Sequence, residues 1–464
     1  MGKLNHKQMI MALGAFVFAA ILFLTPRPTE DTTFWYSIAV GILMILFWLF
    51  EVVPIYVTAM FPFIFAIPLG ILTPEQLTAA YGHKFIYLFF GGFVLSLALE
   101  KWDVHKQIAE GIIRVVGTSK SRIILGFLLS TALLSMWISN TATALMMLPM
   151  ALAVLSKVPQ KGKSKFPVFL LLSVAYGASI GGMATLVGSP PNILMAGLID
   201  DKYGIKVDFA TWMGVGLPLS LIMLGIVFLF FYLLLGKERS EAIEEVRSER
   251  KKWTANQKRV MVLFLCVVLL WSFRSLLTDS KDPSGFHYSD EGVAVLGAIL
   301  LFFLPGKKKD EKLLDWSDTK RLPWGILLLF GGGMALAKML EVNGVIDQLT
   351  LVFQSYADAP LYILLTVLVA IAIFGTEIMS NMALVSVFIP VVADFALKTD
   401  FTILQLCMPI TLAASCAFML PVGTPPNAIV FSSGMLKINQ MARTGFVLNV
   451  IGVLIVVTFS MLLF

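Results

Sequence analysis

The sequence predicts an all-α polytopic membrane protein whose two halves are inverted-topology repeats of each other. The 464-residue chain is 58% hydrophobic and only 14% charged, with a mean hydropathy of +0.87. Apolar runs of about 20 residues, the length that crosses a bilayer, recur from end to end. Three groups of residues in the first half also recur in the second half, in the same order. No soluble domain has this composition, so we expect one polytopic membrane domain.

Eleven apolar segments are expected to span the membrane. The first is as short as the apolar core of a signal peptide, but prolines and an arginine follow it in place of a small-residue cleavage site. We therefore expect it to be retained. The bounds of the eleven segments, uncertain by about four residues, are 9–24, 36–52, 55–72, 85–101, 168–199, 212–235, 258–277, 291–304, 323–340, 403–432 and 444–464.

Two further apolar segments, 122–156 and 362–397, are expected to form re-entrant hairpins, which enter and leave the membrane on one side. With these hairpins and a cytoplasmic N-terminus, 27 of the 35 lysines and arginines fall on the inner side, as the positive-inside rule requires. The pattern predicts a cytoplasmic N-terminus and an outer C-terminus. It also explains the net charge of +6 without nucleic acid as a partner.

Four polar or amphipathic segments connect these elements. The charged segments 237–259 and 305–321 are expected to be solvated on the cytoplasmic side, the first as a helix. A partner site on 237–259 is the alternative. The amphipathic segments 102–121 and 341–356 are expected to lie along the two membrane faces.

The internal repeat indicates a gene duplication with inversion. FFGGFVLSLALEKWDV at 89–104 resembles LFGGGMALAKMLEVNG at 329–344, at an offset of 240 residues. A Ser-Asn pair and a Gly-Ser/Thr-Pro-Pro-Asn motif recur at offsets of 241 and 235 residues. Five crossings, an odd number, separate the fourth span from the ninth, so the halves must be inverted. Inverted repeats with interrupted helices are typical of secondary transporters, whose sites lie where the repeats meet.

The two proline motifs, GSPPN at 188–192 and GTPPN at 423–427, lie inside predicted spans. Consecutive prolines remove amide donors and clash with the preceding turn, so each helix must break there. The freed carbonyls then need partners, and a cation is one; they belong to Val187, Gly188, Val422 and Gly423. Kinks satisfied by neighbouring helices are the alternative, but two matched breaks favour a binding site.

The Ser-Asn pairs, Ser139-Asn140 and Ser380-Asn381, lie in the middle of the two predicted hairpins. If a helix begins at each pair, its backbone amides favour an anion. Two such tips meeting from opposite sides would hold a doubly charged anion. Helix capping and packing by Ser and Asn are the alternative. Glu377, beside the second pair, is either a proton or cation site or a hairpin residue that pairs with a backbone donor.

These paired motifs resemble those of the divalent anion:sodium symporter (DASS) family, the INDY-like di- and tricarboxylate transporters, over nearly the whole chain. The resemblance implies an elevator-type homodimer, in which a mobile domain moves against a scaffold. The scaffold would comprise 1–121 and 236–356, the latter beginning with the linker helix. The transport domain would comprise 122–235 and 357–464.

The resemblance also implies two sodium sites and a substrate site. The first sodium site would use Ser135, Ser139, Asn140 and the carbonyl of Gly188; the second would use Thr376, the carbonyl of Met379, Asn381 and the carbonyl of Gly423. The substrate carboxylates would contact Ser139, Asn140, Thr141, Ser189, Ser380, Asn381 and Thr424, together with position 382, where Met382 replaces the usual threonine. A thioether cannot donate a hydrogen bond, so this departure bears on which anion is bound.

The sequence therefore predicts a sodium-coupled importer of C4-dicarboxylates such as succinate, malate and fumarate, located in the bacterial inner membrane. A sodium-independent exchanger, or a sodium-coupled carrier of citrate or sulfate, is the alternative. An enzyme is not expected, because the chain has no HExxH motif and no pair of intramembrane acids. A channel is not expected either, because no carbonyl filter or charged ring is evident. No cofactor is expected besides Na⁺ as the coupling ion. The three cysteines show no motif spacing, so they indicate neither a disulfide framework nor a metal site.

Overall fold

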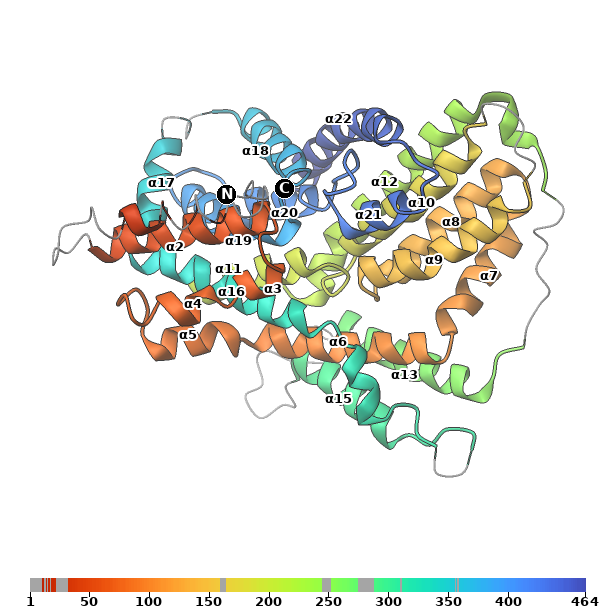
Figure 1. The fold of residues 1–464 in the computed structure, drawn as a ribbon, viewed down its shortest axis with the longest axis horizontal. Coiled ribbons are helices and arrows are strands. Elements are labelled where there is room, and N and C mark those ends of the chain that lie inside the picture. Colours follow the sequence, from red (N-terminus) through yellow and green to blue (C-terminus); the bar gives the residue numbers. More distant parts are fainter. Residues whose placement is uncertain are drawn as a thin grey trace, which may run out of the picture.

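The fold is built from helices alone in the part of the chain that the computed structural model describes (Figure 1). The described residues are 32–158, 164–243, 252–273, 288–308, 311–354, 356 and 359–464, with a few positions between 11 and 21. Most of the predicted first span, 9–24, therefore lies outside them. Seven described helices are long and apolar enough to cross a membrane. The other predicted spans are interrupted, shorter, or outside the described residues.

The N-terminal part contains two of the predicted spans as continuous helices. They are α2 (Thr32–Leu49) and α6 (Lys84–Lys101), and the short α5 (Pro74–Tyr81) precedes α6. The amphipathic segment predicted at 102–121 contains α7 (Val104–Val116), which packs against the first hairpin arm.

The span predicted at 55–72 is wrong as a single helix. The chain there forms two short helices, α3 (Ile55–Thr58) and α4 (Phe61–Phe65), and the second has Pro62 in its first turn. The break leaves the carbonyl of Ala59 free to accept a hydrogen bond from the Tyr81 hydroxyl. Gly332 packs onto the same residue, where a side chain would clash with the Ala59 carbonyl.

The first predicted hairpin is a pair of helices, α8 (Lys120–Ser135) and α9 (Asn140–Leu155), that lie side by side with α10 (Figure 1). The span predicted at 168–199 is interrupted where expected. Helix α10 (Phe166–Met183) ends before the first proline motif, and α11 (Pro190–Tyr203) begins within it. Helix α12 (Phe209–Leu235) follows as the next span.

The second half repeats this arrangement. Its hairpin arms are α18 (Leu361–Gly375) and α19 (Asn381–Ala396), and both pack against α20 (Ile403–Ala413). The break after α20 ends at α21 (Pro425–Phe431), and α22 follows. The remaining elements are α13 (Ala255–Ser272), α15 (Asp290–Phe303), η3 (Trp316–Arg321), α16 (Trp324–Val342), α17 (Val345–Gln354) and α22 (Ile438–Leu463).

The two halves interleave around the interrupted helices. Helix α9 of the first hairpin packs against α21 of the second half, and α19 of the second hairpin packs against α11 of the first half. Helices α6, α13 and α15 lie along one edge of the molecule, and α18 and α22 lie along the opposite edge (Figure 1). The helix breaks therefore lie inside a bundle to which both halves contribute.

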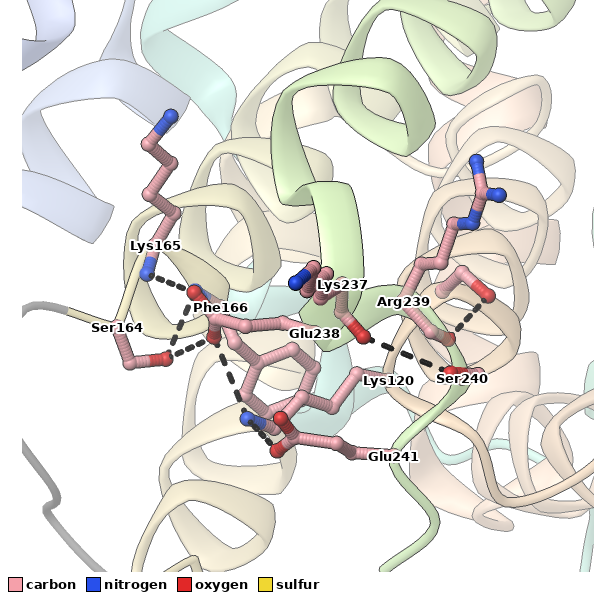
Figure 2. A network of polar contacts seen from close by, with 10 residues as sticks. Lys120, Ser164, Lys165, Phe166, Lys237, Glu238, Arg239, Ser240 and Glu241 are labelled. Carbon is pink, nitrogen blue, oxygen red and sulfur yellow. Dashed lines mark hydrogen bonds and ion pairs between the residues drawn. The ribbon is translucent and has the colours of Figure 1, made fainter.

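The prediction of a continuous helix over 237–259 is wrong, because residues 241–243 and 252–254 are not helical; residues 244–251 lie outside the described residues. After the short η1 (Gly236–Ser240), the chain runs extended beside the start of α8, where Lys120 N–H donates to the Glu241 carbonyl at 2.9 Å. Figure 2 shows the Lys120 ammonium between two carboxylates, at 3.3 Å from Glu238 Oε2 and 2.7 Å from Glu241 Oε2. Ser164, before α10, also donates to Glu238. These contacts tie the ends of α8, α10 and α12 together.

Candidate functional site

Each predicted hairpin tip is a helix start with a serine cap. Ser139 Oγ accepts a hydrogen bond from Ala142 N–H at 3.3 Å at the start of α9, and Ser380 Oγ accepts from Ala383 N–H at 3.2 Å at the start of α19. Serine favours this position because its oxygen satisfies an amide that has no partner within the helix. The capping alternative is therefore confirmed for both serines. Each cap leaves the asparagine that follows it as the first residue of the helix.

The residues beside the first tip form a nest of oxygens, which we call the first nest. It consists of Ser135 Oγ, Asn140 Oδ1 and the carbonyls of Ala178 and Gly188. Ser135 Oγ lies 2.7 Å from Asn140 Oδ1 and 2.7 Å from the Ala178 carbonyl. Turning the amide over would place its nitrogen 3.3 Å from the Gly188 carbonyl, which shows that this carbonyl faces the same position. Ser135, Asn140 and Gly188 are thus brought together as predicted.

The second tip has a matching set, the second nest, formed by Thr376 Oγ1, Asn381 Oδ1 and the carbonyl of Ala414. Thr376 Oγ1 lies 2.6 Å from Asn381 Oδ1 and 2.8 Å from the Ala414 carbonyl. Thr376 is fully buried. The hydroxyl, the asparagine and the helix carbonyl thus take the same roles in both halves, as an inverted repeat requires.

The second nest contains more close oxygen pairs than protons. A hydroxyl group carries one proton, so it can donate to only one of the two acceptor oxygens beside it. The remaining close pair is repulsive unless a donor or a cation lies between the oxygens. In the first nest, a turned Asn140 amide would donate to Ser135 Oγ, the Ala178 carbonyl and the Gly188 carbonyl. The chemistry of both nests, three or four neutral oxygens around one point, fits a small hard cation.

The asparagine that ends each proline motif fastens the interrupted helix. Asn192 Nδ2 donates to the carbonyls of Gly182 and Thr185, both at 2.9 Å. Asn427 Nδ2 donates to the carbonyls of Ala417 and Leu420, at 2.9 and 3.0 Å. Carbonyls freed by the helix break would otherwise be buried without a partner, at a substantial cost in free energy. This explains why both motifs end in Asn.

Glu377 is a buried carboxylate that accepts hydrogen bonds from the backbone of the second helix break. Its Oε1 accepts from the backbone N–H groups of Phe418 and Met419, each at 2.7 Å, and from Asn449 Nδ2 at 2.8 Å. Its Oε2 accepts from Leu420 N–H at 2.9 Å. The expectation that Glu377 pairs with backbone donors is confirmed, and the carboxylate joins the second hairpin to the loop before the second proline motif.

A cavity of about 220 Å³ reaches the first tip from one end of the molecule. It lies between that tip, α6 and the start of α16, and Ser139 and Thr141 line it together with Ser96, Glu100 and Arg321. None of the other predicted substrate contacts lines this cavity. Ser189, Thr424 and Met382 are buried, Met382 within the apolar core, while Ser380 and Asn381 are half-buried.

Charged residues surround the mouth of this cavity. Arg321 forms an ion pair with Glu100, and Lys101 Nζ lies 2.7 Å from Asp318 Oδ2. Burial alone would raise the pKa of Asp318, but hydrogen bonds from Lys101 and from the Asp315 N–H hold that pKa below its ordinary value. The mouth thus carries fixed charges of both signs.

Ion pairs also join the opposite ends of the same two helices to α11. Lys84, at the start of α6, pairs with Asp200 of α11, and Lys338, near the end of α16, lies 4.0 Å from Asp201. Glu100 and Arg321 lie at the other ends of α6 and α16. The cavity thus lies at one end of this helix pair, and ionic contacts join α6 and α16 to α11 at the other.

The family model described as "Sodium:sulfate symporter transmembrane region" matches residues 6–464. The chain belongs to this family.

Curated proteins of known name are similar to this chain over most of its length. The sodium-dependent dicarboxylate transporter SdcS of Staphylococcus saprophyticus is 35% identical over 95% of this chain and 88% of its own length. The protein of the same name from Staphylococcus aureus is 36% identical, over 96% of this chain and 89% of its own length. Among solved structures, the Alcanivorax borkumensis YdaH transporter matches with a TM-score of 0.56 at 12% identity, covering 84% of this chain and 86% of that chain. The last match concerns the fold alone.

Two of the oxygens that form the nests were not predicted from the sequence. They are the carbonyls of Ala178 and Ala414, which face the nest hydroxyls. A backbone carbonyl has no residue-type pattern, but the repeat offers a signal, because Ala178-Ser179 and Ala414-Ser415 recur at matched places before the two proline motifs. The carbonyls of Met379 and Gly423, predicted for the second site, take no part in the hydrogen bonds of the second nest, so their role stays a prediction.

We predict that Asn427→Ala destabilises the protein, because it leaves two buried carbonyls without a donor. The expected loss is about 2–4 kcal/mol, from the usual cost of unsatisfied buried groups. Thermal unfolding of the purified protein in detergent would show a melting temperature several degrees lower. The control is Asn439→Ala at an exposed position of α22, which should unfold like the wild type. Equal melting temperatures for all three proteins would contradict the fastening role of Asn427.

Proposed function

We propose that this protein is a sodium-coupled secondary active transporter that imports C4-dicarboxylates such as succinate, malate and fumarate. The observation that carries the proposal is the pair of matched nests, in which a hydroxyl, an asparagine oxygen and a helix carbonyl converge beside an interrupted helix. The names of the relatives support sodium as the coupling ion and a dicarboxylate as the substrate.

Each nest would hold one sodium ion. The first site would use Ser135, Ser139, Asn140 and the carbonyl of Gly188, with the Ala178 carbonyl as a further ligand. The second would use Thr376, Asn381 and the carbonyls of Met379 and Gly423, with the Ala414 carbonyl added. Sodium suits such sites because it takes neutral oxygen ligands, including carbonyls at unwound helix ends. An ion in the second nest would also separate the oxygens that face one another there.

The substrate carboxylates would bind at the two capped helix starts. Helices α9 and α19 each direct free backbone amides toward their N-termini, where a negative charge is favoured. Neutral side chains would complete the site from both halves: Ser139, Asn140, Thr141, Ser189, Ser380, Asn381, Met382 and Thr424. Two sodium ions would offset the charge of the dianion before it leaves water. We therefore propose that sodium binds before the dicarboxylate.

Transport would follow an elevator motion in a homodimer. Residues 122–235 and 357–464 would form the mobile domain, and residues 1–121 and 236–356 the scaffold. Under the positive-inside rule the N-terminus would be cytoplasmic and the C-terminus outside. The cavity at Ser139 would then open to the cytoplasm, and the Lys84–Asp200 and Lys338–Asp201 pairs would hold the outer end closed. This arrangement corresponds to an inward-facing state in the cell membrane.

A direct experiment is uptake of radiolabelled succinate into proteoliposomes that contain the purified protein. We expect saturable uptake that requires an inward sodium gradient and that excess malate and fumarate inhibit. Uptake that depends on internal dicarboxylate but not on sodium would indicate the exchanger instead. Inhibition by citrate or sulfate alone would indicate another divalent anion, and the absence of saturable flux would contradict transport of this substrate class.

We predict that Asn140→Ala and Asn381→Ala each reduce sodium-dependent succinate uptake by at least about tenfold, because each removes a nest oxygen and a tip side chain. The measurement is uptake at equal amounts of inserted protein, determined by quantitative immunoblot of the proteoliposomes. Asn439→Ala is the matched control and should transport normally. Normal transport by either nest variant would refute the site assignment.

We predict that Met382→Thr alters the competition profile among succinate, malate, fumarate and citrate. A threonine hydroxyl can donate to a carboxylate, whereas the methionine thioether cannot. Since Met382 is buried, the substitution also removes apolar packing, so Met408→Thr on α20, a buried methionine outside the tips, serves as control. Identical profiles for wild type and Met382→Thr would argue against contact between position 382 and the substrate.

A further inference from the structure

The two nests differ in charge, although their ligands match. The residue after the nest hydroxyl is Met136 in the first half and Glu377 in the second half. Both positions tie the hairpin tip to the loop that precedes the proline motif. A neutral side chain thus occupies this place beside the first nest, and a carboxylate occupies it beside the second.

The tie in the first half is formed by neutral groups. Thr185 Oγ1 donates to the carbonyl of Met136 at 2.5 Å and accepts from Gly188 N–H at 3.1 Å. In the second half Leu420 stands at the place of Thr185, seven residues before the motif asparagine. Leucine cannot form these bonds, and the Glu377 carboxylate takes their place by accepting from three consecutive backbone amides. Between the two halves, Leu420 thus stands in place of Thr185 and Glu377 in place of Met136, and the second difference compensates for the first.

The Glu377 carboxylate is next in sequence to the second nest and has no cationic partner in the described part of the chain. Glu377 follows Thr376 directly, and a Cβ built on Gly423 would lie 3.0 Å from Glu377 Oε2. Glu377 is 3% exposed, and its partners are four N–H donors, none of which carries a formal charge. A buried carboxylate without a counter-charge is costly, and a cation placed nearby lowers that cost.

We propose that Glu377 makes the second nest the stronger sodium site, so that this nest binds its ion at a lower sodium concentration than the first. This inference rests on the proposed sodium-coupled function. Glu377 acts as a positioning residue: it fixes the loop that leads to Gly423 through three amides and adds a negative potential at the nest without contacting the ion. The same carboxylate repels a dianion while the nest is empty. The second sodium ion is therefore required before the dicarboxylate enters.

The test separates the effect of the charge at position 377 from the effect of the side-chain shape. Glu377→Gln keeps the shape and removes the charge, whereas Glu377→Asp keeps the charge and shortens the side chain. We measure the sodium concentration that gives half-maximal succinate uptake in proteoliposomes. Removal of one partly screened neighbouring charge should raise that concentration about tenfold in Glu377→Gln. In Glu377→Asp the rise should stay within about threefold, since the charge remains near the nest. Asp347→Asn, an exposed carboxylate on α17, is the control and should match the wild type.

The outcomes separate this inference from the proposed function. If wild-type uptake does not depend on sodium, the proposed function fails and the inference fails with it. If wild-type uptake depends on sodium but Glu377→Gln has an unchanged half-maximal concentration, only the inference is overturned. A larger shift in Glu377→Asp than in Glu377→Gln would also overturn it, because the effect would follow side-chain shape. A fall in maximal uptake alone, at constant half-maximal concentration, would indicate a purely structural role.

Discussion

The structure depends on how buried oxygens find partners where helices are interrupted inside an apolar bundle. Each proline motif breaks a helix and frees carbonyls that neither water nor hydrocarbon can satisfy. The chain meets part of this need itself, through Asn192 and Asn427 and through the tie at each hairpin tip. At Thr376, however, the oxygens outnumber the protons available to join them. A site that remains short of positive charge in this way is suited to a cation.

The internal repeat explains why the two nests are alike and why each could change separately. Duplication gives each half its own set of ligands, and the second arm of each hairpin, α9 or α19, packs against the interrupted helix of the other half. Once two copies exist, each can change separately. The pairs Met136–Thr185 and Glu377–Leu420 are alternative ways to close the same loop, and only one of them adds a charge.

Features that depend on residue type were predictable from the sequence, whereas features of the backbone were not. The helix breaks at the proline motifs, the helix starts at Ser139 and Ser380, and the pairing of Glu377 with amides follow from the chemistry of those side chains. The carbonyls of Ala178 and Ala414 were missed because every residue has one. The span at 55–72 was wrong because apolar composition does not reveal that packing of Gly332 and Tyr81 onto Ala59 fixes a break. The helix at 237–259 was wrong because high charge does not reveal pairing with residues 118–120.

Equilibrium binding of ²²Na⁺ to the purified protein tests the cation-nest account most directly, because it needs no substrate and no transport. The account predicts saturable binding to the wild type, with the loss of one site in Ser135→Ala and the loss of the other in Thr376→Val. The absence of saturable sodium binding to the folded wild-type protein, or full binding by both variants, would contradict it.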